Sequence, residues 1–430
     1  MAHSRWIRLV CLAQVLALAP LAGAASYQDV DHSFSFEFYA TDVFPWIDGS
    51  RSGAVKDTRG EMAKALQSMI TGTRSRLEVA LYGTKKQGWF IESLRKLANR
   101  RESVPVEVVV DQRVGDVGDW NPDNFDYSDT VELAKTLGDE AVRPDVDASG
   151  AVNVNSIMHN KFVVADRKKV WLGSANVSHT DMGSDYNVNV ALLLKNPEIA
   201  RVYSDEFRQM FHDRRFSTEK MARDDQRPFR FKDGTIAEVY FSPQDDTMNR
   251  AILEFIRRSS KTLDIAMFFL TDMKAATALK DAVKRGVKVR LIYDALAGAH
   301  AASKHSWLRD QGVDVRVENW GGKMHMKAAI SDGADVLLGS VNWSSAGALK
   351  NDENTLVVRR NQKLAEQMSA YYEKLWATLE DDSGDGDSDR SARRVPRNPR
   401  AEGKESINAC RDGIDNDHDG LVDSEDDGCS

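Results

Sequence analysis

The sequence predicts an α/β protein made of two similar halves, each an α/β/α sandwich with helices on both faces of a sheet. Two observations predict this fold. A pattern of His, Lys, Asp and a Gly-Ser pair occurs twice with the same internal spacing, and a strand-helix-strand pattern precedes each copy. Such units build helix-covered sheets with right-handed crossovers where the strands are parallel. Halves related by pseudo-twofold symmetry would bring both copies to their interface, a common place for a ligand cleft, so we expect the active site there.

Residues 1–24 are expected to be a secretory signal peptide. Arg5 and Arg8 precede an apolar run over 9–21, and small residues lead up to Ala24. This is the three-part pattern of a signal peptide that is cleaved after Ala24. A membrane anchor is the alternative, but the run is short and contains Gln and Pro. We therefore expect a secreted or periplasmic protein without a transmembrane segment.

The first half is expected over residues 25–220. A helix pattern over 62–70 precedes an apolar strand over 76–82, and a second helix pattern leads to a strand over 106–111. A long polar segment over 112–156 follows. Long loops near a site often gate or select substrates.

The second half, expected over residues 235–379, repeats this order. Its elements are a helix over 249–259, a strand over 262–268, a helix over 275–285, a strand over 287–294 and a closing helix over 361–379. The charged segment 217–233 contains Pro228 and ends before Gly234, so we expect it to link the halves.

Each copy of the pattern predicts a β-hairpin. The expected strands are Ile157–Ala165 and Lys169–Leu172 in the first copy, and Met324–Ser331 and Asp335–Leu338 in the second. Alternate side chains of a strand share a face. We therefore expect His159 to lie beside Lys161, and His325 beside Lys327.

Together the two copies supply groups that bind a phosphate. Neutral donors follow both hairpins at the same offset, namely Ser174, Asn176, Ser340 and Asn342. Phosphoryl transfer depends on positioning and on fixed cations and donors that stabilise charge on the oxygens. Because imidazole titrates near neutrality, one His can attack phosphorus while the other protonates the leaving oxygen. The predicted route passes through a phosphohistidine and needs no cofactor for catalysis.

A metal site is the alternative use of the two histidines. The ammonium two residues after each His would repel a cation, and no carboxylate or Cys lies two to four residues from either His. A His that merely packs in the core is the other alternative. The duplication of the neighbouring Lys, Gly-Ser and Asn residues favours a functional site over both.

The double His-x-Lys-x4-Asp pattern with its trailing Gly-Ser-x-Asn resembles the phospholipase D superfamily, whose members include phospholipases, phospholipid synthases and some nucleases. The resemblance extends loosely from about Val43 to Leu379. It implies that His159 and His325 are the nucleophile and the general acid, and it favours His159 as the nucleophile.

The same resemblance implies roles for the remaining motif residues. The implied phosphate ligands are Lys161, Lys327, Asn176 and Asn342. Asp166 and Asp332 complete the catalytic pattern, although in such folds they more often hold the hairpin turn.

The resemblance also singles out Glu353, because a Glu at this place orients a catalytic His in some family members. The ungapped counterpart of Glu353 in the first copy is Asn187. The halves are therefore not equivalent, and the orienting carboxylate for one His would come from elsewhere. A surface position without a role is the alternative for Glu353.

The resemblance and composition together define the function that we expect. The leading hypothesis is an exported phosphodiesterase that hydrolyses phospholipids to phosphatidic acid and an alcohol head group, with transfer to another alcohol as an accompanying reaction. A secreted metal-independent nuclease is the runner-up, and a binding protein without turnover is a third hypothesis.

Charge favours the lipid over the nucleic acid. The formal net charge is −8, but the C-terminal tail accounts for it and the body is nearly neutral. Nucleic-acid binders usually carry a basic excess. The expected partner is a phospholipid or a membrane surface, and we expect a monomer.

Three tryptophans lie in loops near the hairpins. Packing as loop anchors is the favoured interpretation for Trp120 and Trp307. For Trp320, five residues before His325, we hypothesise contact with a ligand.

The C-terminal tail is expected to be separate from the body. Residues 380–405 have the composition of a disordered linker, and residues 406–430 contain Cys410 and Cys429, which could close a small loop in an oxidising compartment. The spacing of a calcium-binding loop is met by Asp415, Asp417, Asp419, Leu421, Asp423 and Asp426. An acidic disordered tail without calcium is the alternative.

Overall fold

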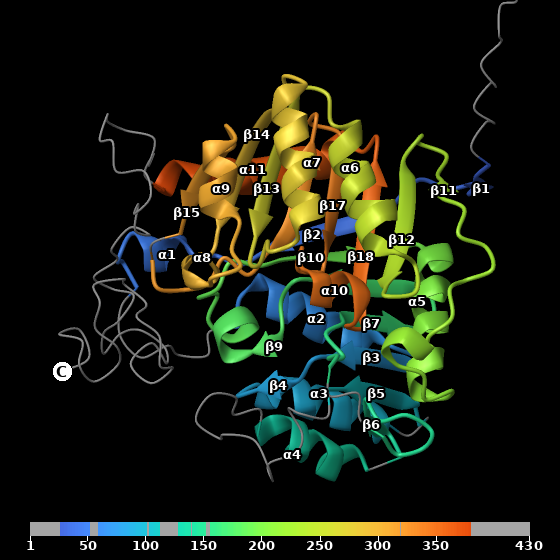
Figure 1. Ribbon diagram of the computed structural model, residues 1–430. Coiled ribbons are helices and arrows are strands. Elements are labelled where there is room, and N and C mark those ends of the chain that lie inside the picture. Colours follow the sequence, from blue (N-terminus) through green and yellow to red (C-terminus); the bar gives the residue numbers. More distant parts are fainter. Residues whose placement is uncertain are drawn as a thin grey trace, which may run out of the picture.

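The computed structural model describes residues 26–51, 59–100, 103–111, 128–138, 140–151, 155–318 and 320–379. Two large mixed sheets lie one above the other in Figure 1, and helices pack on both of them. This arrangement confirms the predicted α/β fold with two similar halves. None of the helices in these ranges has the length and apolar character that a membrane-spanning segment needs.

The first sheet has seven strands, and its central strands are apolar runs buried on both faces. In spatial order these are β2 (Phe36–Ala40), β10 (Val190–Leu194), β8 (Lys169–Gly173), β7 (Lys161–Ala165), β3 (Leu77–Leu81), β5 (Val106–Val110) and β6 (Val142–Pro144). A separate short pair joins β4 (Thr84–Lys85) to β9 (Val177–Ser178).

The second sheet repeats this order with two additional edge strands. The matching strands are β12 (Ile236–Ser242), β18 (Glu353–Arg359), β17 (Asp335–Gly339), β16 (Lys327–Ser331), β13 (Thr262–Met267), β14 (Lys288–Tyr293) and β15 (Asp314–Val317). In both halves the hairpin strand, β7 or β16, pairs antiparallel with the first strand of the parallel unit. The predicted duplication therefore extends to the order and direction of the strands.

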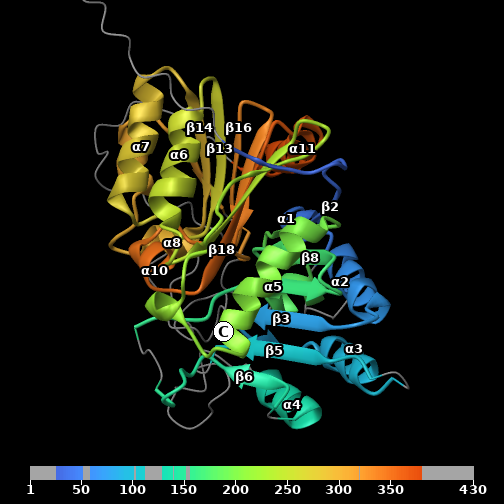
Figure 2. The ribbon, with the colours of Figure 1, turned by 90° about the vertical axis from the view of Figure 1, so that its right-hand side faces the viewer.

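The helices cover the sheets in two ways. Outer helices are α2 (Glu61–Gly72), α3 (Gly88–Ala98) and α4 (Ser128–Leu137) on the first sheet, and η4 (Met248–Leu253), α6 (Glu254–Arg258), α7 (Met273–Lys284) and α9 (His305–Asp310) on the second. Inner helices are α5 (Pro197–Phe211) and α11 (Gln362–Thr378). In Figure 2, α6 and α7 cover one side of the second sheet and α11 lies on the other. Short turns of helix are α1 (Phe44–Ile47), α8 (Ala295–Ala299) and α10 (Ser345–Leu349).

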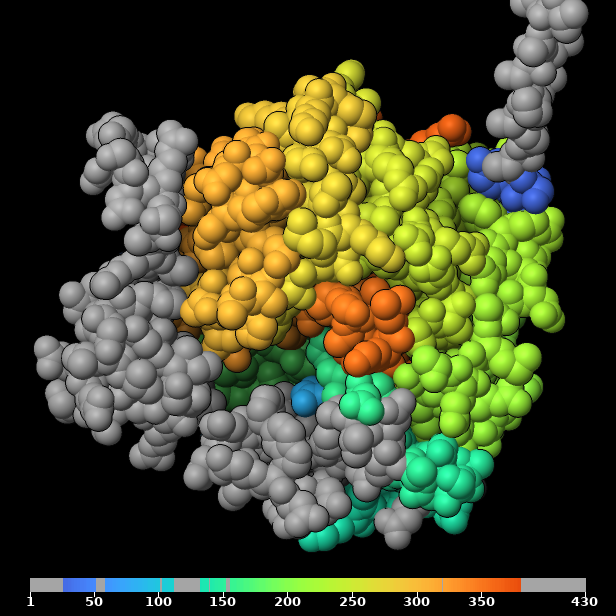
Figure 3. Space-filling model, viewed as in Figure 1, coloured from blue at the N-terminus to red at the C-terminus, as the bar shows by residue number. Residues whose placement is uncertain are grey.

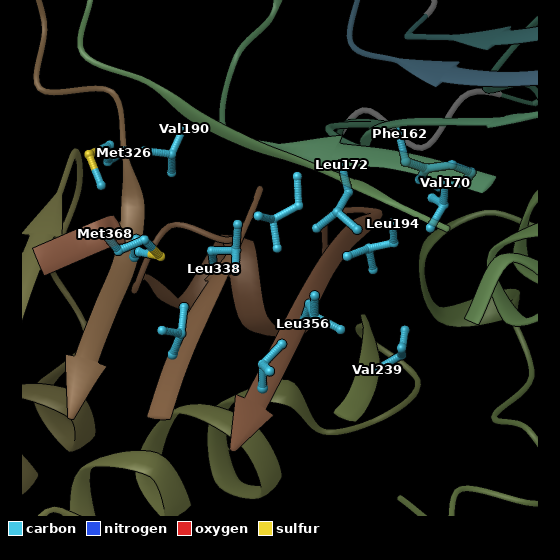
Figure 4. Packing of buried hydrophobic residues seen from close by; sticks show 14 of the residues in the cluster. Phe162, Val170, Leu172, Val190, Leu194, Val239, Met326, Leu338, Leu356 and Met368 are labelled. Carbon is cyan, nitrogen blue, oxygen red and sulfur yellow. The ribbon is translucent and has the colours of Figure 1, made fainter. Parts of the chain in front are cut away.

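One hydrophobic core runs through both halves. Leu172 and Val190 of the first sheet belong to the same cluster as Leu338 and Leu356 of the second, and the inner helices add further apolar side chains. Figure 4 shows these residues facing one another across the interface. Burial of apolar surface is the main favourable term in association of this kind. The halves are therefore held in a fixed relation by a continuous core.

The N-terminal segment connects the two sheets. β1 (Gln28–Asp29) pairs in parallel with β11 (Phe229–Arg230) at the edge of the second sheet, whereas β2 belongs to the first. The carboxylate of Asp29 lies 2.7 Å from Arg230 Nε. The range that we expected for the first half thus also contributes a strand to the second sheet.

The segment between the halves is fixed by a buried ion network. Lys220 follows the 3₁₀ turn η3 (Ser217–Glu219), and its side chain is fully buried. Its Nζ lies 2.5 Å from Glu206 Oε1 on α5 and 2.8 Å from Asp352 Oδ1, beside β18. It also donates to the carbonyl of Ser242 at 2.9 Å. Although burial opposes its charge, Asp352 and Glu206 raise the pKa of Lys220 above its ordinary value.

Lys220→Met is expected to lower the free energy of unfolding by about 3–5 kcal/mol, because it leaves two buried carboxylates without their cation. Urea denaturation measures this loss. The control is Lys64→Met, which removes an exposed ion pair with Glu61 and should not change the midpoint measurably. Equal midpoints for the two variants would show that the buried network does not hold the halves together.

Candidate active site

Both His-bearing segments pair with the backbone of the opposite half. Met158 forms a parallel bridge with Asp352, and Met324 forms the equivalent bridge with Val188. The hydrogen bonds run from His159 N to Asp352 O (2.9 Å), Asp352 N to Ile157 O (2.9 Å), His325 N to Val188 O (3.0 Å) and Val188 N to Lys323 O (2.8 Å). The prediction that both His residues lie within the hairpin strands is therefore wrong. The strands β7 and β16 begin only at the lysines.

Two aspartates at strand ends fix these segments. Asp111 follows β5 and accepts a hydrogen bond from Met158 N at 2.9 Å. Asp294 follows β14 and accepts one from Met324 N, also at 2.9 Å. Both carboxylates are fully buried. Sequence reasoning missed these roles, although an Asp ends the second parallel strand in both halves and was a signal that could have been used.

Each imidazole is oriented by a side chain of the opposite half. Nδ1 of His159 lies 2.9 Å from both carboxylate oxygens of Glu353. Nδ1 of His325 lies 3.0 Å from Oδ1 of Asn189. A hydrogen on Nδ1 of each ring can be donated to Glu353 or to Asn189, respectively. The lone pair of each Nε2 then stays available for chemistry. The interaction of Glu353 with His159 removes the alternative that Glu353 is a surface residue without a role.

The counterpart of Glu353 in the first half is Asn189 and not Asn187. The pairs that fix the register are Ala191 with Gly173 and Thr355 with Gly339. The ungapped alignment fails because the first half has a longer loop before β10. This loop contains the π-helical turn η2 (His179–Gly183), where the second half has α10.

Lys161 and Lys327 are both buried at the interface, and each residue is 1% exposed. Each Nζ donates to the carbonyl of the His two positions earlier, at 2.9 Å for Lys161 and 2.7 Å for Lys327. Tyr82 lies 5.8 Å from Lys161 Nζ and Phe268 lies 4.9 Å from Lys327 Nζ, measured to the ring centroids. Because an ammonium has three donors, each Lys retains donors for a ligand.

The predicted neutral donors divide into two groups. The buried amide oxygens of Asn176 and Asn342 have no hydrogen-bond partner among the described residues. Because an amide oxygen only accepts, the NH2 of each side chain is the group that would donate to a phosphate oxygen. Ser174 and Ser340 instead turn toward the neighbouring strand. A backbone N–H of β10 donates to Ser174 Oγ at 3.2 Å, and one of β18 donates to Ser340 Oγ at 3.0 Å. These hydroxyls hold strands together behind the imidazoles.

Asp166 and Asp332 lie away from this group, at the opposite ends of β7 and β16. Asp166 Oδ1 accepts the backbone N–H of Ser75 at 2.6 Å, and Asp332 Oδ1 accepts that of Lys261 at 2.7 Å. Both residues have positive φ, 57° and 53°, as the tight turn requires. Their position contradicts a catalytic role and matches the alternative that they hold the hairpin turn.

Burial is the largest influence on the charged groups of the site. Burial lowers the pKa of His159 to about 4, against the opposing effect of Glu353. Burial also lowers the pKa of Lys161 to about 8. For His325 and Lys327, burial and the neighbouring Lys residues lower the pKa well below its ordinary value. A bound anion would reverse these shifts, because an opposite charge nearby favours the protonated form.

The remaining predicted positions lie partly in the core and partly outside the described residues. Trp320 is buried in the core shared by both halves, and its indole nitrogen has no hydrogen-bond partner among the described residues, so ligand contact by Trp320 stays a prediction. Trp307 packs against the outer core of the second half as expected, but it does so from helix α9 and not from a loop. Trp120, residues 1–24 and residues 380–430, with the predicted calcium ligands, lie outside the described residues. Within the described ranges, no three His, Cys, Asp or Glu side chains group to hold a metal ion.

Each half of this duplicated α/β fold carries one His–Lys motif, and each His is oriented by a side chain of the other half. This arrangement defines a class of proteins whose active site lies between two similar halves. Figure 3 shows the surface hollowed between the halves beside α10, which follows Asn342 in the chain. The family model described as "Cardiolipin synthase, PLD-like domain" matches residues 66–211 and 252–376, well over half of the chain. The chain therefore belongs to this phospholipase D-like family, and the resemblance inferred from the motifs is confirmed.

Curated relatives match a smaller part of the chain. A mitochondrial cardiolipin hydrolase of Xenopus tropicalis is 32% identical over 134 residues, which are 31% of this chain and 63% of that protein. The protein of the same name from Chlamydomonas reinhardtii is 32% identical over 124 residues, 29% of this chain and 55% of that protein. The chain thus spans less than two thirds of the length of either relative.

Solved structures support the two-half fold. Phosphatidylserine synthase of Haemophilus influenzae Rd KW20 covers 81% of this chain and 89% of its own, with a TM-score of 0.57 and 12% identity. Polyphosphate kinase of Porphyromonas gingivalis covers 83% of this chain and 53% of its own, with a TM-score of 0.51 and 15% identity. At these identities the likeness concerns the fold alone.

Inorganic phosphate is expected to raise the melting temperature, because it compensates the buried ammonium groups. The effect should weaken above about pH 8, where Lys161 loses its charge. Lys327→Met should lose most of the phosphate-dependent shift in a calorimetric scan, whereas Lys168→Met, at an exposed turn, should keep it. A shift of wild-type size in Lys327→Met would contradict an anion site at the interface.

Proposed function

We propose that this protein is an exported phosphodiesterase that hydrolyses phospholipids to phosphatidic acid and an alcohol head group. The observation that supports this most is the pair of imidazoles from opposite halves, each held at Nδ1 by the other half and accompanied by a buried Lys. Such a pair offers a nucleophile and a general acid on two sides of one phosphate.

In the first step, Nε2 of His159 attacks phosphorus and forms a P–N bond. The bond from phosphorus to the head-group oxygen breaks, and His325 gives its proton to that oxygen. Glu353 stabilises the positive charge that His159 gains, because its carboxylate lies 2.9 Å from Nδ1. Lys161, Lys327, Asn176 and Asn342 would hold the non-bridging oxygens.

In the second step, the now neutral His325 takes a proton from water, and the water oxygen attacks phosphorus. The P–N bond breaks, which releases phosphatidic acid and restores His159. An alcohol in place of water would accept the phosphatidyl group in the same way. Transfer to an alcohol is therefore part of the proposal, and no step requires a metal.

Two observations support a phospholipid as the substrate. The curated relatives are named for cardiolipin hydrolysis. The body of the chain also lacks the basic excess that usually accompanies nucleic-acid binding. Export rests on the N-terminal sequence pattern, and calcium binding rests on the spacing of acidic residues in the tail.

His159→Ala and His325→Ala are each expected to reduce head-group release from phosphatidylcholine vesicles by a factor of about 10² to 10⁴ or more. Release should continue in EDTA, and DNA incubated in parallel without added metal should stay intact. Near wild-type turnover in either variant would contradict the division of labour between the two imidazoles. Cleavage of DNA with intact lipid would favour the nuclease alternative.

The pH dependence follows from the two imidazoles. His159 must be neutral, and its pKa of about 4 keeps it neutral down to that pH. His325 must be protonated. Because burial and nearby Lys residues lower the pKa of His325, the protonated fraction increases as the pH falls. We therefore expect kcat/KM with vesicles to rise as the pH falls from 8 toward 5. A steady fall over this range would show that a different group supplies the proton.

A further inference from the structure

The two imidazoles have different acidic neighbours. His159 contacts the carboxylate of Glu353 directly, whereas His325 contacts the amide of Asn189. A carboxylate nevertheless lies behind that amide. Asp181 Oδ2 is 4.0 Å from Nδ1 of His325, and Asn189 donates its NH2 to Asp181 Oδ1 at 3.1 Å.

Asp181 is built firmly into this place. It lies on η2 and is 1% exposed. Its Oδ2 accepts the backbone N–H of Asn176 at 2.7 Å, and its Oδ1 accepts the side chain of Asn187 at 2.8 Å. These hydrogen bonds fix the position of the Asp181 carboxylate behind Asn189.

The second half has no room for an equivalent carboxylate. Ser178 accepts the backbone N–H of Asp181, and Ser344 accepts that of Gly347, so Gly347 takes the place of Asp181. A Cβ on Gly347 would lie 2.6 Å from the carbonyl oxygen of Asn342, which forbids a side chain. The longer loop of the first half, which forms a π-helical turn where the second half has α10, therefore accommodates an acid behind Asn189.

We propose that Asp181, acting through Asn189, is the positioning carboxylate of His325 and supports the protonated form that this residue needs as general acid. The proposal deepens the proposed function and rests on it. Asn189 keeps the imidazole oriented with its hydrogen on Nδ1, and Asp181 fixes the amide so that its oxygen faces the ring. The charge of Asp181 then partly offsets the cations around His325.

Those cations come from several elements. Lys327 lies on β16, Lys161 on β7 and Lys323 on the approach to His325, and His159 lies nearby. All four disfavour a proton on His325. The carboxylate of Asp181 lies 4.0 Å from Nδ1 of His325, so its removal should make protonation of His325 harder still.

The test compares two phosphodiesters that differ in their need for an acid. Choline leaves phosphatidylcholine as an alkoxide and needs a proton, whereas nitrophenol leaves a nitrophenyl phosphodiester as a stable anion. Asp181→Asn is expected to lower kcat for phosphatidylcholine at neutral pH about tenfold or more, as a pKa shift of one unit implies. The nitrophenyl ester should change less than about threefold, a range within the usual context dependence of such effects.

Two further variants keep the result interpretable. Asp185→Asn makes the same change at another buried carboxylate two residues beyond η2, and should leave both substrates unaffected. The exchange Asp181→Asn with Asn189→Asp keeps the charge but puts it in contact with His325, as Glu353 is with His159. It should restore phosphatidylcholine hydrolysis and move the high-pH limb upward relative to Asp181→Asn.

The outcomes separate this inference from the proposed function. Equal losses on both substrates in a folded Asp181→Asn protein, or no loss on either, would overturn the role of Asp181 while leaving the phosphodiesterase intact. An exchange variant that behaves like Asp181→Asn would also overturn it. Wild-type protein that hydrolyses neither ester would overturn the proposed function itself.

Discussion

The site depends on a reciprocal pairing in which each His-bearing segment is hydrogen bonded to the backbone of the opposite half. Neither half orients its own imidazole, since the groups that hold Nδ1 also come across the interface. A small rotation of one half would therefore misplace both rings together. The shared core and the buried network of Lys220 keep that rotation from occurring, which links the stability of the fold to the geometry of the chemistry.

The sequence predicted what is local and duplicated. Short stretches of sequence determine the strand and helix patterns, their order and the two hairpins. Because the chain is duplicated, each of these patterns could be recognised in both halves. The position of His159 and His325 could not be predicted in this way, because long-range pairing with Asp352 and Val188 ends the strands at the lysines. Asn189 was missed because a loop of different length shifts the alignment, and loop conformation leaves no periodic signal.

The two halves share one fold, but their imidazoles contact different side chains. Both imidazoles have the same backbone setting, but one faces a carboxylate and the other an amide backed by a carboxylate. In the proposed mechanism, direct contact with Glu353 suits a ring that is cationic while it carries the phosphatidyl group. In the proposed mechanism the amide of Asn189 orients the ring that must release its proton, and the carboxylate of Asp181 acts on that ring through the amide. The difference between the halves thus fits the different tasks that the proposal gives to equivalent positions.

The buried lysines explain why such a site costs stability without a ligand. Lys161 and Lys327 contact carbonyls and aromatic faces, and burial lowers the pKa of both. A core built for stability alone would not bury two ammonium groups at one interface. In the proposed function the phosphate group of the substrate compensates these charges, so part of the substrate's binding energy offsets the cost of burying them. Functional sites commonly give up stability in this way, and here the strain is electrostatic.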